Sequence, residues 1–393
     1  MSDPPEQRGP FLEPAHPADA HRFAHDAMAC TWGIHILGHE RDYAEQAARA
    51  AFAEIDRLEQ ELSRFVETSD IARINVLSTG ERLCIGPDAF DCIELAQRMH
   101  DETSGAFDIT VGARLASGQR TSQRYPAIPP ASDQTPHAEN KNPPRSEHNS
   151  RTPNLKSQIS NRKIPNHQVS NHQVSNHRIS NCQFSNQANP APAGGQILHL
   201  DRRTHSVAVS VAGLVVDLGG IGKGYAIDRA AETLREWSID TALIHSGQST
   251  LLALGSPRGA IGSSASGASS VSSRRSGWEI AIRDPDDHAR VLGTVWLRDR
   301  ALSGSGIAIH GRHIIDPRTS RTAASPRGAW ALAESAAVSD ALSTAFMVLL
   351  PDEVDNFCRG RAGVGALLLL GSRRGRALRR YGDVAELGDF PVS

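Results

Sequence analysis

Three short segments of this 393-residue chain combine residue types that can act on a phosphate. The first runs Val216-Asp-Leu-Gly-Gly-Ile-Gly-Lys-Gly-Tyr225, where a predicted strand enters a glycine-rich turn and a predicted helix leaves it. Glycines let the backbone approach a ligand, and the helix N-terminus adds partial positive charge beside Lys223, which suits a pyrophosphate. The segment matches neither a Walker A loop nor the GxGxxG pattern. A tight strand–helix turn with a surface lysine explains the residues equally well.

The second segment pairs a carboxylate with a hydroxyl. Asp340 and Thr344 lie four residues apart in an apolar stretch, so they share one face of a predicted helix. A buried aspartate needs a partner or a metal, and these hard oxygens suit Mg²⁺ beside phosphates. The alternative is an aspartate on the exposed edge of the helix and a threonine bonded back to its own helix.

The third segment, His310-Gly-Arg-His-Ile-Ile-Asp-Pro-Arg-Thr319, holds two histidines. Histidine is the usual general base near neutral pH. A hairpin turn built from Asp316-Pro317 is the alternative, and turn chemistry alone favours it.

Hydrophobic periodicity predicts the elements that must position these segments. In chain order they are a strand at 31–36, helices at 42–66 and 87–99, a hairpin at 197–211, a strand at 214–218, a helix ending at 236, strands at 241–244, 278–282 and 293–297, a loop containing Ser303 and Gly304, a helix at 331–349 and a strand at 365–370.

Residues 115–195 have a different character. The unit Asn-His-Gln-Val-Ser at 166–170 recurs at 171–175 and then degrades. A period of five fits neither a helix nor a strand, and the composition offers too little apolar surface to offset the ordering entropy. We therefore expect a disordered insertion at 115–195 within one domain spanning 21–385, preceded by a disordered, proline-rich tail at 1–20.

Composition excludes several classes of protein. A net charge of −2 provides no strong field for nucleic acid, and no apolar stretch is long enough for an integral membrane segment. The 5 cysteines are irregularly spaced, which argues against a disulfide framework or a structural zinc site. No signal peptide is evident, so the sequence as it stands predicts a cytoplasmic protein; export or membrane anchoring is the alternative if the true start lies upstream.

Taken together, the three segments resemble the ApbE-type FAD:protein FMN transferase family. The family patterns D-L-G-G-I-[AG]-K-G-Y, H-I-I-D-P-R-T-G and S/A-D-A-L-[AS]-T-A have counterparts here in that order. Flanking matches lie at Ser63–Phe65, Ser69–Asn75 and Gly105–Gly112. The resemblance covers about 24–114 and 196–370.

The resemblance implies an α+β fold of two lobes, with mixed or antiparallel sheets, outer helices and FAD in the cleft between them. It implies that FAD is the substrate and that Mg²⁺ is required. A Ser/Thr hydroxyl of an acceptor flavoprotein would attack the FMN phosphorus and release AMP. The implied residues are His313 as the catalytic base; Gly222 (through its carbonyl), Asp340 and Thr344 as metal ligands; and Met28, Asp108, Gly219, Gly220, Lys223, Ser303 and Gly304 around the FAD.

The chain also departs from the family pattern. The family's M-G-T is Met28-Ala29-Cys30 here, its G-G-D is Gly247-Gln248-Ser249, and the glycine after D-P-R-T is Ser320. The lost carboxylate leaves two further functions open. One is an FAD pyrophosphatase, in which water replaces the acceptor, and the other is a non-catalytic flavin-binding protein.

Overall fold

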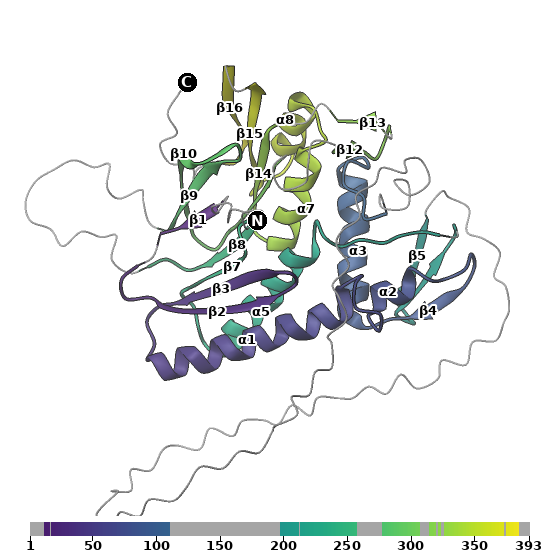
Figure 1. The fold of residues 1–393 in the computed structure, drawn as a ribbon, viewed down its shortest axis with the longest axis horizontal. Helices are drawn as coiled ribbons and strands as arrows, with labels where there is room; N and C mark the ends of the chain where they lie inside the picture. Colours follow the sequence, from purple (N-terminus) through teal and green to yellow (C-terminus); the bar gives the residue numbers. More distant parts are fainter. Residues whose placement is uncertain are drawn as a thin grey trace, which may run out of the picture. The chain divides into compact units, whose positions relative to one another are not determined.

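An eight-stranded antiparallel sheet forms the centre of the fold (Figure 1). This computed structural model describes residues 12–15, 17–110, 197–211, 213–257, 277–306, 314–319, 321–323, 326–372 and 375–384. These ranges belong to one compact unit. The predicted insertion at 115–195 lies outside them.

The strand order of the central sheet is β16-β15-β14-β11-β8-β7-β3-β2, and every neighbouring pair is antiparallel. This confirms the α+β class with antiparallel sheets. The strands are β2 (His21–Ala27), β3 (Cys30–Ile36), β7 (Ala242–Ser246), β8 (Thr250–Leu254), β11 (Ala301–Gly306), β14 (Gly328–Ala333), β15 (Gly365–Ser372) and β16 (Gly375–Gly382).

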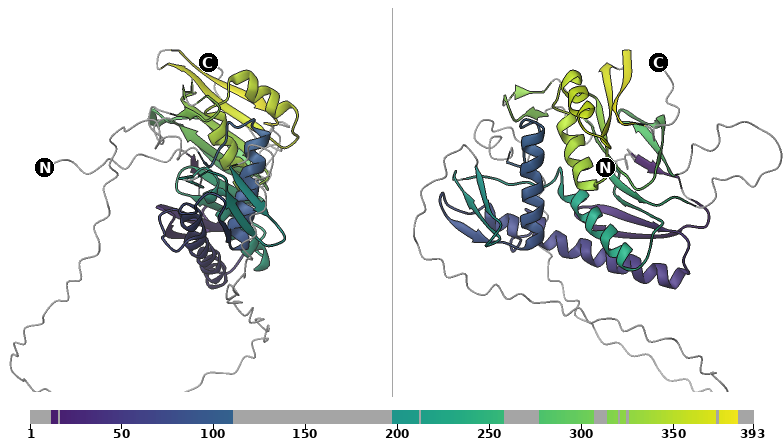
Figure 2. Two further views of the ribbon diagram at one scale, coloured as in Figure 1. Left: turned by 90° about the vertical axis from the view of Figure 1, so that its right-hand side faces the viewer. Right: turned by 180° about the vertical axis from the view of Figure 1, so that it is seen from behind.

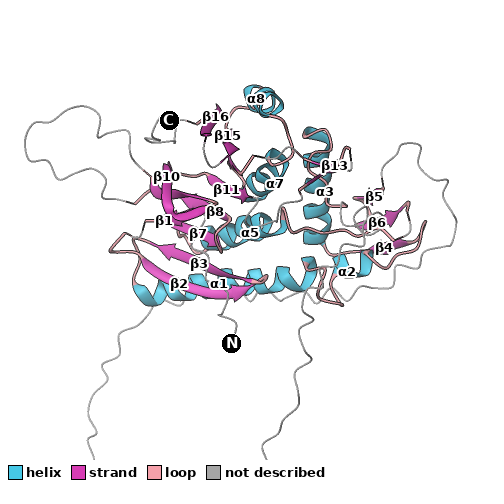
Figure 3. Ribbon diagram, turned by 45° about the horizontal axis from the view of Figure 1, so that its top comes forward, coloured by secondary structure: helices cyan, strands magenta, loops and turns pink. Residues whose placement is uncertain are grey.

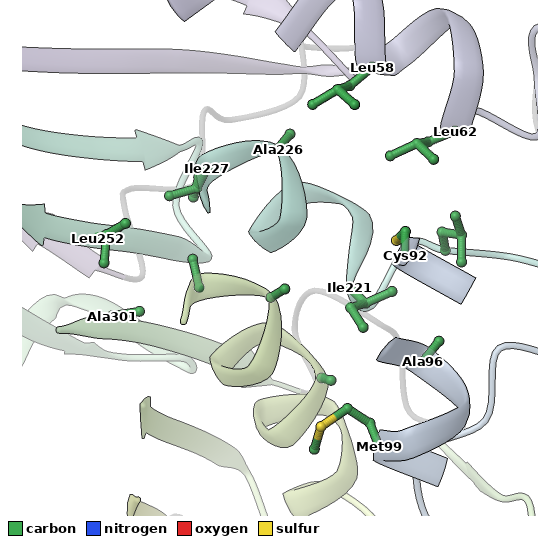
Figure 4. Packing of buried hydrophobic residues seen from close by; sticks show 14 of the residues in the cluster. Leu58, Leu62, Cys92, Ala96, Met99, Ile221, Ala226, Ile227, Leu252 and Ala301 are labelled. Atoms are coloured by element: carbon green, nitrogen blue, oxygen red, sulfur yellow. The ribbon is translucent and has the colours of Figure 1, made fainter. Parts of the chain in front are cut away.

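Helices cover one face of this sheet (Figures 2 and 3). They are α1 (Arg41–Leu62), α3 (Pro87–Glu102), α5 (Gly222–Glu236) and α7 (Ala336–Phe346), with the short α2 (Asp70–Ile74) and α8 (Pro351–Arg359) nearby. One large apolar cluster joins them to the sheet, and Figure 4 shows side chains of α1, α3 and α5 meeting in it. None of the helices in the described ranges is both long and apolar enough to cross a membrane.

A second sheet, of order β1-β9-β10, covers the opposite face with β1 (Leu12–Pro14), β9 (Trp278–Asp284) and β10 (Asp287–Leu297). Strand alternation separates the two cores. Ala331 faces the helices, whereas its neighbour Trp330 packs with Trp278 in the second cluster. The smaller pairings are β4 (Arg82–Cys84) with β6 (Ser206–Val209) and β5 (Leu198–Asp201), and β12 (Ile315–Asp316) with β13 (Arg321–Thr322).

The structure corrects several predicted elements. The helix predicted at 331–349 is the end of β14 followed by α7, because a strand buried on both faces has a continuous apolar pattern that resembles a helix. Ser303 and Gly304 lie on β11 and not in a loop. Helix α1 ends at Leu62 and not at residue 66 as predicted, and Phe65 beyond its end is 79% exposed.

Two further differences concern backbone pairing. The segment 214–218 is not a strand: the backbone N–H and C=O of Val216 pair with the side-chain amide of Asn75 instead of with another backbone. Within the predicted tail at 1–20, Leu12–Pro14 pairs with β9 because Leu12 enters the second core. Strands β2, β8 and β16 were not predicted.

The hairpin between β2 and β3 turns through Met28 and Ala29. Ala27 pairs with Cys30, so the loop has two residues, and their φ angles are +48° and +58°. Two positive φ values define the type I′ turn that suits the twist of a hairpin. A residue with a Cβ is strained by roughly 1 kcal/mol in this region, where glycine is not.

Ala29→Gly is therefore expected to stabilise the protein by about 1 kcal/mol, because it relieves the left-handed strain at an exposed position. Urea unfolding measures the change. The matched control is Ala24→Gly on the extended part of β2, which should destabilise. A lower stability for Ala29→Gly than for the parent would show that this turn is not strained.

Candidate active site

The glycine turn lies between the segment at 107–109 and helix α7. The N–H of Asp217 donates to the carbonyl of Ile109 at 2.8 Å, and one Asp217 carboxylate oxygen accepts from the N–H of Gly219 at 2.9 Å. A Cβ on Gly220 would lie 3.1 Å from Oγ1 of Thr344 and 3.3 Å from the ring of Phe107. Gly220 thus lets the turn approach α7 more closely than a larger residue would.

Asp340 lies against the first turn of α5. Its side chain is only 5% exposed, so it is not on the wet edge of its helix. One carboxylate oxygen accepts from the N–H of Gly224 and the other accepts from the hydroxyl of Thr250, both at 3.2 Å. Thr344 does bond back to its own helix, through a 3.3 Å contact from its hydroxyl to the carbonyl of Asp340.

Three hydroxyls lie side by side on the sheet beneath Asp340. Thr250 on β8 pairs with Ser246 on β7 and with Ser303 on β11, and directly paired residues point to the same face. Ser246 and Ser303 are fully buried, and within the described residues neither hydroxyl has a hydrogen-bond partner. A buried unpaired hydroxyl costs about 1–3 kcal/mol, so this polar row needs an explanation beyond packing.

The turn at Met28 borders the same region. Met28 packs against the main core, and a Cβ on Gly247 would lie 3.2 Å from Cβ of Cys30. Burial raises the pKa of the Cys30 thiol to about 11; the positive charge of Lys223 opposes this rise and the negative charge of Asp340 adds to it. The thiol is therefore neutral at pH 7 and within electrostatic reach of both charged groups.

Lys223 and Asp108 complete the surroundings of the turn. Nζ of Lys223 donates to the carbonyl of Gly219 at 3.1 Å, which keeps its charge over the turn. One carboxylate oxygen of Asp108 accepts from the N–H and the hydroxyl of Thr110, at 2.8 and 2.6 Å. The neighbours of Asp108, Phe107 and Ile109, are the residues that contact the turn.

The predicted base, His313, lies outside the described residues, as does His310. The described chain resumes at Ile314 and enters β12. Burial alone would raise the pKa of the Asp316 carboxyl, but the Arg318 guanidinium holds it below its ordinary value. Arg318 also binds Glu353 at 2.8 Å, which ties this segment to α8.

The structure brings Asp340 and Thr344 against the glycine turn that contains Gly219, Gly220, Gly222 and Lys223. Asp108 lies between the two residues that contact this turn, whereas Met28 packs against the main core. Ser303 reaches the group through Thr250, and the N–H of Gly304 donates to the carbonyl of Ser249 at 2.7 Å.

The available oxygen atoms fit a magnesium ion that is shared with a phosphate. Within the described ranges, no three His, Cys, Asp or Glu side chains are grouped to hold a metal. Asp340 is a single carboxylate beside a hydroxyl and a helix start, and Mg²⁺ commonly takes one or two carboxylates and completes its shell with phosphates and water. A cation could therefore bind here together with an anionic ligand.

Sequence reasoning missed two residues that shape the site. Thr250 holds one oxygen of Asp340, and Asn75 holds the backbone at the entry to the glycine turn. Asn75 ends the Ser69–Asn75 segment, so its motif match was a usable signal. Thr250 had none, because a threonine in an apolar strand is unremarkable until its partner is known.

Several solved structures share this fold. The flavin transferase ApbE of Vibrio cholerae is 18% identical, with a TM-score of 0.61 over 93% of this chain and 98% of that one. The ApbE protein of Thermotoga maritima is 20% identical, with a TM-score of 0.61 over 92% and 97%. At these identities the likeness establishes the fold.

The family follows from the sequence match. The ApbE family model matches residues 28–368, and the chain belongs to this family. A Treponema pallidum (strain Nichols) relative named FAD:protein FMN transferase is 31% identical over 44% of this chain and 48% of its own length. A Klebsiella pneumoniae (strain 342) protein of the same name is 23% identical over 84% and 79%. The match to the Treponema protein therefore spans about half of that protein.

Asp340→Asn is expected to weaken Mg²⁺ binding in the presence of FAD by more than about tenfold, because it removes the single negative charge while keeping the shape. Thr344→Val should have a smaller effect. Titration calorimetry of Mg²⁺ into the FAD-loaded protein measures both. Asp101→Asn, at a 74% exposed carboxylate of α3, is the control. Wild-type Mg²⁺ affinity in Asp340→Asn would make Asp340 a purely structural residue.

Proposed function

We propose that this protein is an FAD:protein FMN transferase that uses Mg²⁺ to transfer FMN from FAD to a Ser/Thr hydroxyl of an acceptor flavoprotein, with release of AMP. The observation that carries the proposal is the meeting of buried Asp340 with the glycine turn at the start of α5, in a chain of the ApbE family. A carboxylate, backbone N–H groups and Lys223 at one place suit a metal-bound pyrophosphate.

Each group has a distinct task in this reaction. Lys223 binds the pyrophosphate beside the N-terminal end of α5, and the two together neutralise part of its charge. Asp340, Thr344 and the Gly222 carbonyl would hold Mg²⁺, which supplies further neutralisation of the phosphate oxygens. His313 takes the proton of the acceptor hydroxyl. The hydroxyl oxygen then bonds to the FMN phosphorus, the pyrophosphate bond breaks and AMP leaves.

One observation favours the alternative function, hydrolysis of FAD by a pyrophosphatase. The turn between β7 and β8 carries Gly247-Gln248-Ser249, so it lacks the carboxylate of the family pattern. The backbone carbonyl of Gln248 instead accepts from the N–H of Leu12 at 3.2 Å. If this change weakens acceptor binding, water would replace the acceptor at an unaltered phosphate site.

AMP release separates these functions. The protein is incubated with FAD and Mg²⁺, with and without a flavoprotein acceptor, and AMP and acceptor-bound flavin are measured. AMP that appears only with acceptor, together with covalent flavin, supports the transferase. AMP at the same rate without acceptor would show a hydrolase, and bound FAD without AMP would show a flavin-binding protein.

His313→Ala is expected to keep FAD bound and to lower turnover by roughly 10²–10⁴, which is the usual contribution of a general base. His310→Ala, three residues earlier in the same segment, is the matched control and should retain most of the activity. FAD binding is measured by fluorescence and turnover by AMP release. Loss of activity in His310→Ala alone would transfer the role of base to that residue.

A further inference from the structure

Helices α5 and α7 touch through their backbones. A Cβ on Gly224 would lie 2.3 Å from the carbonyl oxygen of Ala336, a distance that no real side chain tolerates. The first turn of α5 therefore rests directly on the first turn of α7. Figure 1 shows the two helices meeting end to end beside β8, and α7 also packs against β11.

Asp228 lies one turn beyond Gly224, on the face of α5 that meets α7. Its carboxylate accepts from the N–H of Ala336 at 2.8 Å, the N–H of Ala337 at 2.9 Å and the hydroxyl of Ser335 at 2.7 Å. The first N–H groups of a helix have no partner within it, and a side chain of the same helix usually caps them. Here the local cap, Ser335, accepts from the N–H of Val338, and the carboxylate of a different helix accepts from the two N–H groups before it.

The capping is reciprocal. Asp340 lies one turn beyond Ala336 and accepts from the N–H of Gly224, in the first turn of α5. Each helix thus donates backbone N–H groups to an aspartate of the other. Because the two sets of bonds cross the contact in opposite directions, they restrict both sliding and rotation of α7 against α5.

Small movements of α7 would change the positions of Asp340 and Thr344 relative to the glycine turn. Thr344 lies one turn beyond Asp340, and its hydroxyl is close enough to Gly220 that a Cβ there would meet it at 3.1 Å. One residue of helical rise is about 1.5 Å, so a shift of even half that distance would alter both contacts.

We propose that Asp228 is a positioning residue: by capping α7 from α5, it sets the register that places Asp340 and Thr344 against the glycine turn. The expected effect of Asp228 on Mg²⁺ affinity rests on the proposed function. The restraint that Asp228 places on α7 is independent of that function.

Asp228→Asn tests the proposal in the full-length protein. The amide keeps the shape, but its NH₂ group faces donors, so part of the cap is lost. Hydrogen exchange in the metal-free protein should rise at least about threefold in peptides covering 334–340. It should also rise in peptides covering 222–226, whose N–H groups Asp228 does not bind. With FAD present, the Mg²⁺ concentration for half-saturation should rise about tenfold.

Asp284→Asn is the matched control. Asp284 is a fully buried carboxylate on β9 that accepts from the N–H of Asp286 and pairs with Arg376, on the other side of the central sheet. The Asp284→Asn variant should lower the melting temperature without changing hydrogen exchange at 222–226 or the Mg²⁺ concentration for half-saturation. An equal effect of both variants on exchange and on Mg²⁺ would reduce Asp228 to a contributor to stability and overturn the proposal.

Three further outcomes are decisive. Unchanged exchange at 222–226 in Asp228→Asn overturns the proposal, because the two helix starts would then be independent. If Asp228→Asn does not fold, Ser335→Ala removes one of the three bonds together with the bond from the N–H of Val338 to the Ser335 hydroxyl. Exchange at 222–226, on the other helix, must then rise by a smaller amount than expected for Asp228→Asn, and unchanged exchange there overturns the proposal. If the parent protein binds no Mg²⁺ with FAD, the proposed function fails, and the exchange measurement still decides the role of Asp228.

Discussion

The contact between α5 and α7 at Gly224 is the constraint on which the site depends. Only a residue without a side chain allows Ala336 so close, and this closeness brings the N–H of Gly224 within reach of Asp340. The same approach places Thr344 over Gly220. A glycine turn and a carboxylate that are 116 residues apart in the chain thereby become one structure.

A buried carboxylate is tolerable here because donors surround it. Burying a charge without hydrogen bonds is far more costly than burying a methyl group. Thr250 and Gly224 each satisfy one oxygen of Asp340, while Ser246 and Ser303 add hydroxyls to the same face of the sheet. These polar groups interrupt an otherwise apolar interface between the sheet and the helices. Packing does not explain such an interruption, and the proposed binding of an ionic ligand would explain it.

Two of the departures from the family pattern, at 29–30 and 248–249, lie at the β2–β3 and β7–β8 turns. Ala29 adopts a positive φ where glycine would be unstrained, and Cys30 replaces a hydroxyl with a thiol that burial keeps neutral. Ser249 stands where the family pattern has aspartate, so the β7–β8 turn carries no carboxylate at that position.

The sequence by itself determined the family and, through that resemblance, an α+β class with mixed or antiparallel sheets and a set of candidate residues, because the motifs are local and each combines residue types with a specific chemistry. It could not separate β14 from α7, since a strand buried on both faces shows the same apolar run as a helix. Nor could it show that Asp340 is buried, that Thr250 supports it, or that Asp228 caps a helix 108 residues further on. Those features depend on partners that are distant in the chain, and only tertiary packing brings them together.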